Sequence, residues 1–412
     1  MSRLIVIGGG AAGIFCAANA ARLHPSLQVI VLEKSTKLLS KVRISGGGRC
    51  NVTNACDDIS VMAKRYPRGT HFVKKAFHQW FTKDTIQWYA ERGVALKAEP
   101  DGRMFPVTDS SETIIECLLR EVNKYKVEIR MKAEVESVLR REAEGGEPGF
   151  LLKLADGREL EADYVCIACG GYPKSTMFDW IRQLGHSIEE PVPSLFTFNI
   201  PQHPVTALMG VSVPDAQVKI QGSRLQERGP LLITHWGLSG PVVLRLSAWG
   251  ARELAANQYT FSIGVNWIPE YTEATAREKL QEIRYEWAAQ KLGSRNPFGL
   301  PNRLWEFLLS QSGLRPDLRF ADMPVREQNK LISLLCAGPF AIKGKTTFKE
   351  EFVTAGGVVL SEVDPSTMQS RKVPGLFFAG EILDVDGITG GFNFQHAWTS
   401  GWVAANTISQ MG

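Results

Sequence analysis

Three glycines near the N-terminus have the spacing of a turn that binds phosphate. Gly8, Gly10 and Gly13 follow the pattern Gly-x-Gly-x-x-Gly. In such a turn the first glycine allows a tight bend, the second lets the backbone approach a pyrophosphate, and the third lets a helix pack closely on a strand. Glu33 lies twenty residues after Gly13, where a carboxylate can accept hydrogen bonds from ribose hydroxyls. This arrangement predicts a bound dinucleotide that contains ADP.

The elements around these residues are those that the turn requires. Residues 4–7 form a continuous apolar, β-branched run, which is typical of a parallel strand buried on both faces. The Ala-rich residues 14–22 predict a helix, whose N-terminal N–H groups and dipole would bind phosphate. A second apolar run, residues 28–32, ends at Glu33. Because strand, glycines, helix, strand and acid occur in this order, the motif is far more specific than the glycines alone.

Two further glycine-rich segments indicate that the dinucleotide is FAD. The first, residues 41–51, holds three consecutive glycines among basic residues and an asparagine, which suits a loop that presents donors to a flat ligand. The second, residues 387–395, follows a short apolar run at residues 376–379 and opens a helix. A helix N-terminus near the isoalloxazine would favour the electron density that accumulates there on reduction.

Composition places the chain among soluble, core-forming proteins. Of its 412 residues, 44% are hydrophobic and 22% are charged, which excludes a disordered chain, a collagen-like repeat and a small disulfide scaffold. The net charge of +4 is too small to predict a specific nucleic-acid partner. The uncharged stretch at residues 4–21 is explained better by the glycine pattern than by a signal peptide or a membrane span. With seven sparse cysteines, we expect a reduced, cytoplasmic protein without a membrane segment.

Two other patterns have ordinary structural explanations. Cys166 and Cys169 lie three residues apart at a predicted strand, so their side chains face opposite sides and suit core positions better than a metal or redox pair. We therefore expect no metal site. One short basic cluster, residues 64–68 with Lys74 and Lys75, is explained by a solvated helical face.

The rest of the chain predicts a discontinuous FAD domain that carries an insertion. Strand-like segments between residues 127 and 168 predict an antiparallel meander that returns to the main sheet. Residues 193–270 predict an inserted β-barrel-like domain, and the apolar stripes of residues 271–345 predict a helical subdomain of the insert. The fold class is therefore α/β, with a Rossmann-like FAD-binding domain formed by residues 1–192 and 346–412.

Seven segments of the chain resemble the bacterial "NAD(FAD)-utilizing dehydrogenase" flavoproteins. They are GGGAAG (8–13), SGGGRCNVTN (45–54), ACGG (168–171), HWGLSGP (235–241), TAGGV (354–358), AGEILDVDG (379–387) and GGFNFQHAWTSG (390–401). That family includes enzymes assigned as aminoacetone oxidases and as bile-acid-related reductases. The resemblance covers both ends of the chain and reaches the middle. It implies FAD bound without a covalent link by a discontinuous domain like that of glutathione reductase.

The resemblance also implies which residues contact FAD. Val135 would bond adenine through its backbone, and further backbone contacts fall at Ala168 and Gly170. The other implied contacts are Gly8, Gly10, Ala12, Gly13, Glu33, Lys34, Lys41, Val42, Gly46, Arg49, Asn51, Gly380, Glu381, Asn393 and Phe394. The chain departs from the superfamily at Cys169, where Thr is usual, so a hydroxyl contact is lost there.

Three side chains are candidates for chemistry beside the flavin. Arg49 would stabilise the anionic reduced flavin or, alternatively, anchor a phosphate. His396 and His235 are candidate proton-transfer groups, because histidine titrates near neutral pH. His396 is the better of the two, since it lies on the helix that the second glycine-rich segment opens.

The sequence leaves three functions open. The preferred one is an FAD-dependent oxidoreductase that acts on a small metabolite, by amine oxidation or by reduction of an unsaturated or carbonyl substrate. Its redox partner would be O2 or NAD(P)H, and NAD(P)H would bind without a Rossmann domain of its own because no second Gly-x-Gly-x-x-Gly is evident. The second is an FAD-dependent enzyme that modifies nucleic acid such as tRNA, and the third is a flavin-binding protein without turnover. The sequence indicates neither the substrate nor the oligomeric state.

Overall fold

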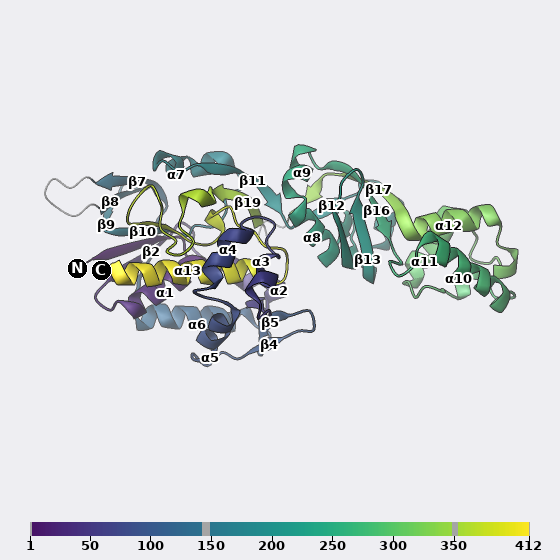
Figure 1. The fold of residues 1–412 in the computed structure, drawn as a ribbon, viewed down its shortest axis with the longest axis horizontal. Coiled ribbons are helices and arrows are strands. Elements are labelled where there is room, and N and C mark those ends of the chain that lie inside the picture. The colour runs from purple at the N-terminus through teal and green to yellow at the C-terminus, as the bar shows by residue number, and fades with distance from the viewer. Residues whose placement is uncertain (1, 142–148, 348–352, 412) are drawn as a thin grey trace. The chain divides into compact units, whose positions relative to one another are not determined.

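The chain divides into two compact units (Figure 1). Unit 1 contains residues 1–194 and 349–412, and unit 2 contains residues 195–348. The computed structural model describes residues 2–141, 149–347 and 353–411. Both ends of the chain therefore belong to unit 1, and unit 2 is a continuous insertion between them.

A five-stranded parallel sheet forms the centre of unit 1. Its strands, in spatial order, are β20 (Leu376–Phe378), β10 (Tyr164–Ile167), β1 (Arg3–Ile7), β2 (Gln28–Glu33) and β6 (Glu128–Met131). The central strand β1 is buried from Leu4 to Ile7, as its apolar run predicts. Because β20 pairs with β10, the C-terminal segment completes a sheet that the N-terminal segment begins. The predicted discontinuous α/β fold is confirmed.

Two helices from opposite ends of the chain pack side by side in unit 1 (Figure 1). They are α1 (Ala11–Leu23), which follows the first glycines, and α13 (Phe392–Met411), which follows the last. A methyl group at Gly401 would lie 2.6 Å from the carbonyl oxygen of Ala12, so the two backbones are almost in contact there. This close packing fixes the start of α13 relative to the start of α1.

Smaller elements flank this core. The predicted meander is present as an antiparallel sheet of β7 (Val135–Arg141), β8 (Gly149–Leu154) and β9 (Glu159–Ala162), although β6, expected within it, joins the main sheet. The other strands are β3 (Thr53–Asn54), β4 (Leu96–Ala98), β5 (Arg103–Pro106), β11 (Ile188–Ser194) and β19 (Val353–Val358). The other helices are α2 (Ser40–Gly48), α3 (Ile59–Ala63), α4 (Thr70–Phe77), α5 (Thr82–Ala90), α6 (Ser111–Lys124) and α7 (Asp179–Gln183).

Unit 2 contains an antiparallel sheet that curls on itself. Its strands, in spatial order, are β17 (Gly338–Lys343), β16 (Thr260–Asn266), β13 (Ser212–Ile220), β14 (Gln226–Ile233), β15 (Gly237–Ser239), β12 (Thr197–Asn199) and β18 (Lys345–Thr346). The two edge strands, β17 and β18, are consecutive in the chain. Gly344 between them donates a hydrogen bond to the carbonyl of Tyr259 and accepts one from the N–H of Asn199. The sheet is therefore barrel-like, as the sequence predicted for the inserted domain.

The helices of unit 2 share one core with this sheet. They are α8 (Pro241–Trp249), α9 (Ala251–Ala256), α10 (Glu273–Glu286), α11 (Asn302–Ser312) and α12 (Val325–Ala337). A single cluster of buried residues includes Phe198 from the sheet and Trp305 and Leu331 from the helices. None of the helices in the described part of either unit is long and apolar enough to cross a membrane.

Candidate dinucleotide site

The three N-terminal glycines have the separate roles that their spacing predicts. A methyl group at Gly8 would lie 2.4 Å from the carbonyl oxygen of Ala168, and one at Gly13 would lie 2.0 Å from that of Gly8. At Gly10, by contrast, a methyl group would meet no atom within 4 Å. Gly8 and Gly13 are thus required by packing inside the protein, whereas Gly10 leaves open space beside the start of α1. That open space is where a pyrophosphate could approach the backbone.

Glu33, at the end of β2, is held beside this turn. Its two carboxylate oxygens accept hydrogen bonds from the N–H of Gly9, at 2.8 Å, and from the N–H of Ser35, at 2.7 Å. Each oxygen keeps a further lone pair for a ligand hydroxyl. The carbonyl of Glu33 also accepts the N–H of Ala133, which brings the chain leading to Val135 next to the acid. The residues predicted to contact adenosine therefore lie close together.

The C-terminal part of α2, from Ser45 to Gly48, departs from helical backbone as its glycines predict. Gly46, Gly47 and Gly48 all have positive φ, and methyl groups at Gly47 and Gly48 would meet no atom within 4 Å. A methyl at Gly46 would lie 2.8 Å from the ring of Phe105, so β5 packs directly against this glycine segment. Open backbone on one side and a buried aromatic ring on the other make this segment suitable for the flat ligand predicted above.

Arg49 is held by neighbours that the sequence did not indicate. Its guanidinium lies over the ring of Phe105, 4.0 Å from the centroid, and donates to Glu99 at 2.7 Å. Asp109 lies 3.7 Å away. The hydrogen bond that Arg49 donates to Glu99 raises the pKa of Arg49 above its ordinary value. Two carboxylates therefore offset the positive charge that Arg49 would offer to a reduced flavin.

A second carboxylate lies where the C-terminal segment returns. Glu381 accepts a hydrogen bond from the N–H of Thr354 at 2.9 Å and forms an ion pair of 2.5 Å with Lys41. The Oγ1 of Thr354 is buried and lacks a partner among the described residues, and a methyl at Gly171 would lie 2.5 Å from it. An unpartnered hydroxyl beside a glycine and a carboxylate is a site that a ligand hydroxyl could complete.

Side chains of the glycine-rich segments also hold the loop before α13. Asn393 donates to the carbonyl of Gly387 and accepts its N–H, at 2.9 and 2.8 Å. With its amide oriented to satisfy both neighbours, Asn51 donates to the carbonyl of Thr53 and accepts the N–H of Gly391. The second and third glycine segments, residues 41–51 and 387–395, are thus joined directly although they lie near opposite ends of the sequence.

The two candidate histidines are in different units. His396, in unit 1, is 2% exposed, and burial lowers its pKa to about 4. Its Nε2 lies 3.3 Å from the carbonyl oxygen of Gly380, while Nδ1 is buried without a partner in the described residues. His235, in unit 2, is exposed and packs edge-on against Trp236. Proton transfer by either residue stays a prediction, and the contacts of His396 favour a positioning role.

Ser400, on α13, is a second residue of this helix that contacts Gly380. The N–H of Gly380 donates to the hydroxyl of Ser400 at 2.8 Å, and that hydroxyl donates to the carbonyl of His396. Gly380 has a φ of +75°, and a methyl there would lie 2.8 Å from Cβ of Ala12. One turn of α13 therefore fixes a glycine that no other residue could replace without strain.

The remaining predicted contacts lie on the same unit but are less constrained. Lys34 is exposed, with its ammonium 5.5 Å from the ring centroid of Tyr172, and Val42 is buried in α2. Phe394 is stacked on Trp398, with 5.8 Å between the ring centroids. Burial raises the pKa of the Cys169 thiol to about 11, so at neutral pH it is not a thiolate.

Sequence reasoning missed one buried ion pair beside the last glycine segment. Asp386 is fully buried and pairs with Arg68, whose Nε donates to it at 2.5 Å, while the hydroxyl of Ser194 donates at 2.7 Å. The motif AGEILDVDG contains this aspartate, but only the fold reveals its partners. A buried acid with two donors fixes the loop on which the third glycine segment begins.

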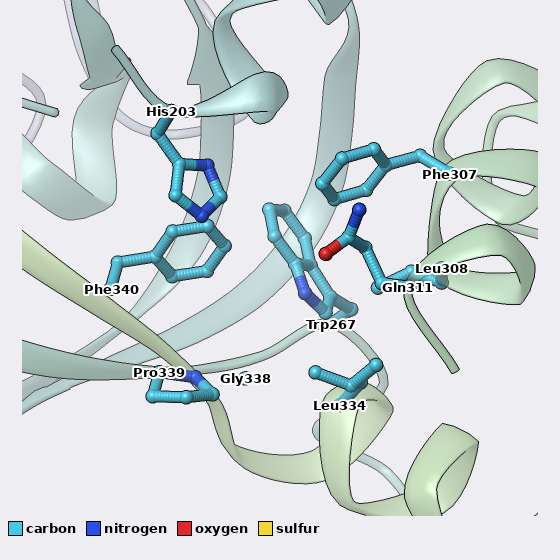
Figure 2. A pocket seen from close by; sticks show the side chains of 9 residues that line it. All are labelled: His203, Trp267, Phe307, Leu308, Gln311, Leu334, Gly338, Pro339 and Phe340. Atoms are coloured by element: carbon cyan, nitrogen blue, oxygen red, sulfur yellow. The ribbon is translucent and has the colours of Figure 1, made fainter. Parts of the chain in front are cut away.

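Unit 2 has a hollow of its own, with a volume of about 170 Å³ (Figure 2). Figure 2 shows the ring of His203 beside that of Phe340, with Trp267, Phe307 and Gln311 facing the same space. Nδ1 of His203 accepts the N–H of Val205, and burial lowers the pKa of this histidine. The lining is largely aromatic and holds no carboxylate, and it shares no residue with the glycine segments.

The fold of unit 1 and the open backbone at its glycines define the class of the protein. Unit 1 is a Rossmann-type dinucleotide-binding domain. The HI0933-like protein Rossmann domain family matches residues 2–407, so the chain belongs to this family. The finer resemblance to aminoacetone oxidases has no such support.

Curated relatives cover nearly the whole chain. A ribosomal RNA dihydrouridine synthase of Escherichia coli (strain K12) is 33% identical, over 98% of this chain and 97% of its own. One from Haemophilus influenzae (strain Rd) with the same name is 32% identical over 99% of both chains. A 3-dehydro-bile acid delta(4,6)-reductase of Clostridium scindens is 30% identical over the full length of both.

Solved structures share the fold at low sequence identity. A 3-ketosteroid delta1-dehydrogenase from Sterolibacterium denitrificans matches with a TM-score of 0.53 at 14% identity, over the whole of both chains. A flavocytochrome c3 fumarate reductase matches with a TM-score of 0.52 at 16% identity, over 99% of this chain and 78% of its own. These likenesses concern the fold alone.

Proposed function

We propose that this protein reduces a carbon–carbon double bond conjugated to a carbonyl, with electrons from NADH or NADPH. The observation that carries the proposal is a reaction shared by relatives with different names. A dihydrouridine synthase saturates the double bond of a uracil ring next to its carbonyl, and a delta(4,6)-reductase saturates double bonds conjugated to a steroid ketone. For a double bond conjugated to a carbonyl, either reduction would be balanced by a hydride that adds to the carbon remote from the carbonyl and a proton that adds to the nearer one.

We infer that the substrate is a uracil ring in ribosomal RNA. Two of the three relatives described above carry that name, at 33% and 32% identity over essentially the whole chain. On this basis we prefer the second function that the sequence left open, an enzyme that modifies nucleic acid, to the small-metabolite function preferred in the sequence analysis. A small enone stays the second candidate, because the delta(4,6)-reductase is 30% identical over its full length. Amine oxidation has no counterpart among these three relatives.

Bound FAD would supply the two-electron chemistry, and the residues of unit 1 would position it. The N–H groups at the start of α1 would bind the pyrophosphate beside Gly10, and Glu33 would accept the adenosine ribose hydroxyls. Glu381, held by Lys41 and by the N–H of Thr354, would accept a further hydroxyl. Every one of these groups is already held in place by the protein, so little ordering would accompany binding.

The reaction also needs a proton donor for the carbon nearer the carbonyl. Of the two candidate histidines, His235 is exposed, whereas His396 is buried and has a pKa of about 4. We propose that His396 positions Gly380 and that another group supplies the proton, because a buried imidazole with a pKa of about 4 is neutral near pH 7. Arg49 would tune the flavin only weakly, because Glu99 and Asp109 already offset its charge.

The proposal is tested by anaerobic single-turnover experiments on the purified holoprotein. The flavin is first reduced with NADPH or NADH and then mixed with a ribosomal RNA transcript, with the same transcript lacking uridines, or with a 4-en-3-one steroid. Reoxidation of the flavin together with a gain of two hydrogens in the RNA, detected by mass spectrometry, supports the first candidate. Turnover of the steroid alone supports the second, and reoxidation by neither substrate contradicts the proposed reaction.

A further inference from the structure

Unit 1 has an open groove that the proposed chemistry does not use. Its volume is about 670 Å³, within the range of about 300–1,000 Å³ that is usual for ligand sites. It runs along one side of α4 (Thr70–Phe77) and is closed on the other side by the segment that follows β19. The lining residues are Gly69, His71, Phe72, Lys75, Leu360, Ser361, Val363, Pro365 and Arg371.

The groove combines cationic side chains with an apolar floor. No carboxylate belongs to its lining, although the negative charge of Asp364, which lies between two lining residues, interacts with Lys75. Arg371 lies 3.4 Å from Asp364 and remains half-exposed, so it can turn toward a ligand. Phe72 and Val363 are buried beneath them. This pattern suits a ligand that has anionic groups spaced along a less polar chain.

The first turn of α4 adds backbone donors to the same groove. The helix begins after Gly69, which has a φ of +81°, and its first intrahelical hydrogen bond runs from the N–H of Val73 to the carbonyl of Gly69. The N–H groups of Thr70, His71 and Phe72 precede that bond and have no partner within the helix. Together with the helix dipole they favour an anion at this end of the groove.

The groove adjoins residues 65–69, which contact the loop at residues 385–392, where the third glycine segment begins. Four of residues 65–69 contact residues 385–392. The carbonyl of Arg65 accepts the N–H of Ile388, and the hydroxyl of Tyr66 donates to the carbonyl of Phe392. Arg68 pairs with Asp386, and Gly69 packs against Val385. A ligand in the groove would therefore lie on a segment fixed to the proposed flavin loop. The exposed Lys64, Arg65 and Lys74 extend the positive charge along the adjoining turns.

We propose that this groove binds the phosphodiester backbone of the RNA whose uracil ring is reduced. The inference rests on the proposed function, and it names a binding site for that substrate rather than the reaction. Lys75 and Arg371 would contact successive phosphates, the first turn of α4 would bind one phosphate through its N–H groups, and Phe72 would contact ribose or base. Affinity for the RNA would then fall with salt, because each phosphate contact releases counterions.

The test measures binding of a fluorescent, uridine-containing, single-stranded RNA to the holoprotein over a range of salt concentrations. Replacing both cations (Lys75→Gln with Arg371→Gln) should weaken binding by about tenfold and reduce the slope of log K against log salt by about 1.4, since each lost contact on a single strand contributes about 0.7. The variant Lys124→Gln on α6 removes one exposed charge elsewhere in unit 1 and should change neither quantity. Flavin absorbance checks that every variant is folded.

Three results would overturn the groove assignment. The wild-type protein could fail to bind the RNA, the double variant could keep the full affinity and slope, or the double variant could lose NADPH affinity while RNA binding is unchanged. The last result would assign the groove to the dinucleotide. Failure of the proposed function is distinguishable, because RNA that binds through the groove but gains no hydrogen contradicts the reaction and leaves the groove in place.

Discussion

Gly10→Ala separates the cofactor-binding role of the first glycines from their packing role. Gly10 has a φ of −86° and ψ of −171°, which alanine adopts without strain, and its added methyl would meet no protein atom within 4 Å. The variant should therefore fold, with a free energy of unfolding unchanged or raised by about 0.4–1 kcal/mol, because alanine restricts the unfolded chain. The methyl would nevertheless occupy the space in which the backbone approaches the pyrophosphate.

The expected loss is at least one charge-assisted hydrogen bond, which contributes about 1.5–3 kcal/mol. The dissociation constant for FAD should therefore rise by about ten- to a hundredfold. The assay is titration of the apoprotein with FAD, followed by quenching of flavin fluorescence, beside urea unfolding of the same sample. Gly13→Ala is the contrasting variant, since its methyl would lie 2.0 Å from the carbonyl oxygen of Gly8 and should disrupt folding. If Gly10→Ala binds FAD as tightly as the wild type, the pyrophosphate does not lie at this turn.

Four further predictions follow from the same contacts. Glu33→Ala should weaken FAD binding by about ten- to a hundredfold, because it removes the ribose acceptor and leaves the N–H groups of Gly9 and Ser35 without their carboxylate acceptor. If the variant binds FAD as tightly as the wild type in the fluorescence titration, Glu33 is not the ribose acid. Arg49→Met should lower the flavin midpoint potential by less than about 30 mV in a dye-coupled titration, because Glu99 and Asp109 already offset the charge, and a larger shift would show that the flavin senses Arg49 directly. His396→Gln should make the stability of the apoprotein less sensitive to acid. As pH falls from about 6.5 towards 4, the imidazole binds a proton in the unfolded chain but not in the folded one, which lowers the wild type's free energy of unfolding by about 2 kcal/mol at pH 5. Urea unfolding at pH 7 and pH 5 would contradict this if both proteins lost the same free energy of unfolding between the two pH values. Joining residue 192 directly to residue 346 should leave a chain that still takes up FAD, because all three glycine segments belong to unit 1, and a colourless, folded product would show that unit 2 is required for binding.

The glycine turn and the first acid could be predicted from the sequence because their spacing is local. The carbonyl that excludes a side chain at Gly8 belongs to Ala168, in a distant segment, but Gly13 is required by the carbonyl oxygen of Gly8, only five residues earlier. The same holds for Glu33, which ends a strand that pairs with the strand before Gly8. Short-range spacing therefore determined the dinucleotide turn, the parallel sheet and the α/β class.

The partners of the charged residues could not be predicted, because they come from distant parts of the chain. Fifty residues separate Arg49 from Glu99, and 318 separate Arg68 from Asp386. A side chain's charge reaches a ligand only if no protein group offsets it first, and that depends on which segments fold together. For this reason the sequence assigned a catalytic cation to Arg49, while the tertiary structure pairs it with two carboxylates.

Burial decided the remaining roles in the same way. The sequence placed His396 on the correct helix, but its lowered pKa arises from complete desolvation by surrounding segments. Likewise, the cluster at residues 64–68 with Lys74 and Lys75 has the composition of any solvated helix face, and only the return of residues 360–371 places one of its members, Lys75, in a groove. The sequence by itself determined the cofactor class and the turn that would hold it. Which charges stay available to a substrate was decided by tertiary packing, since burial and ion pairing depend on contacts between segments far apart in the chain.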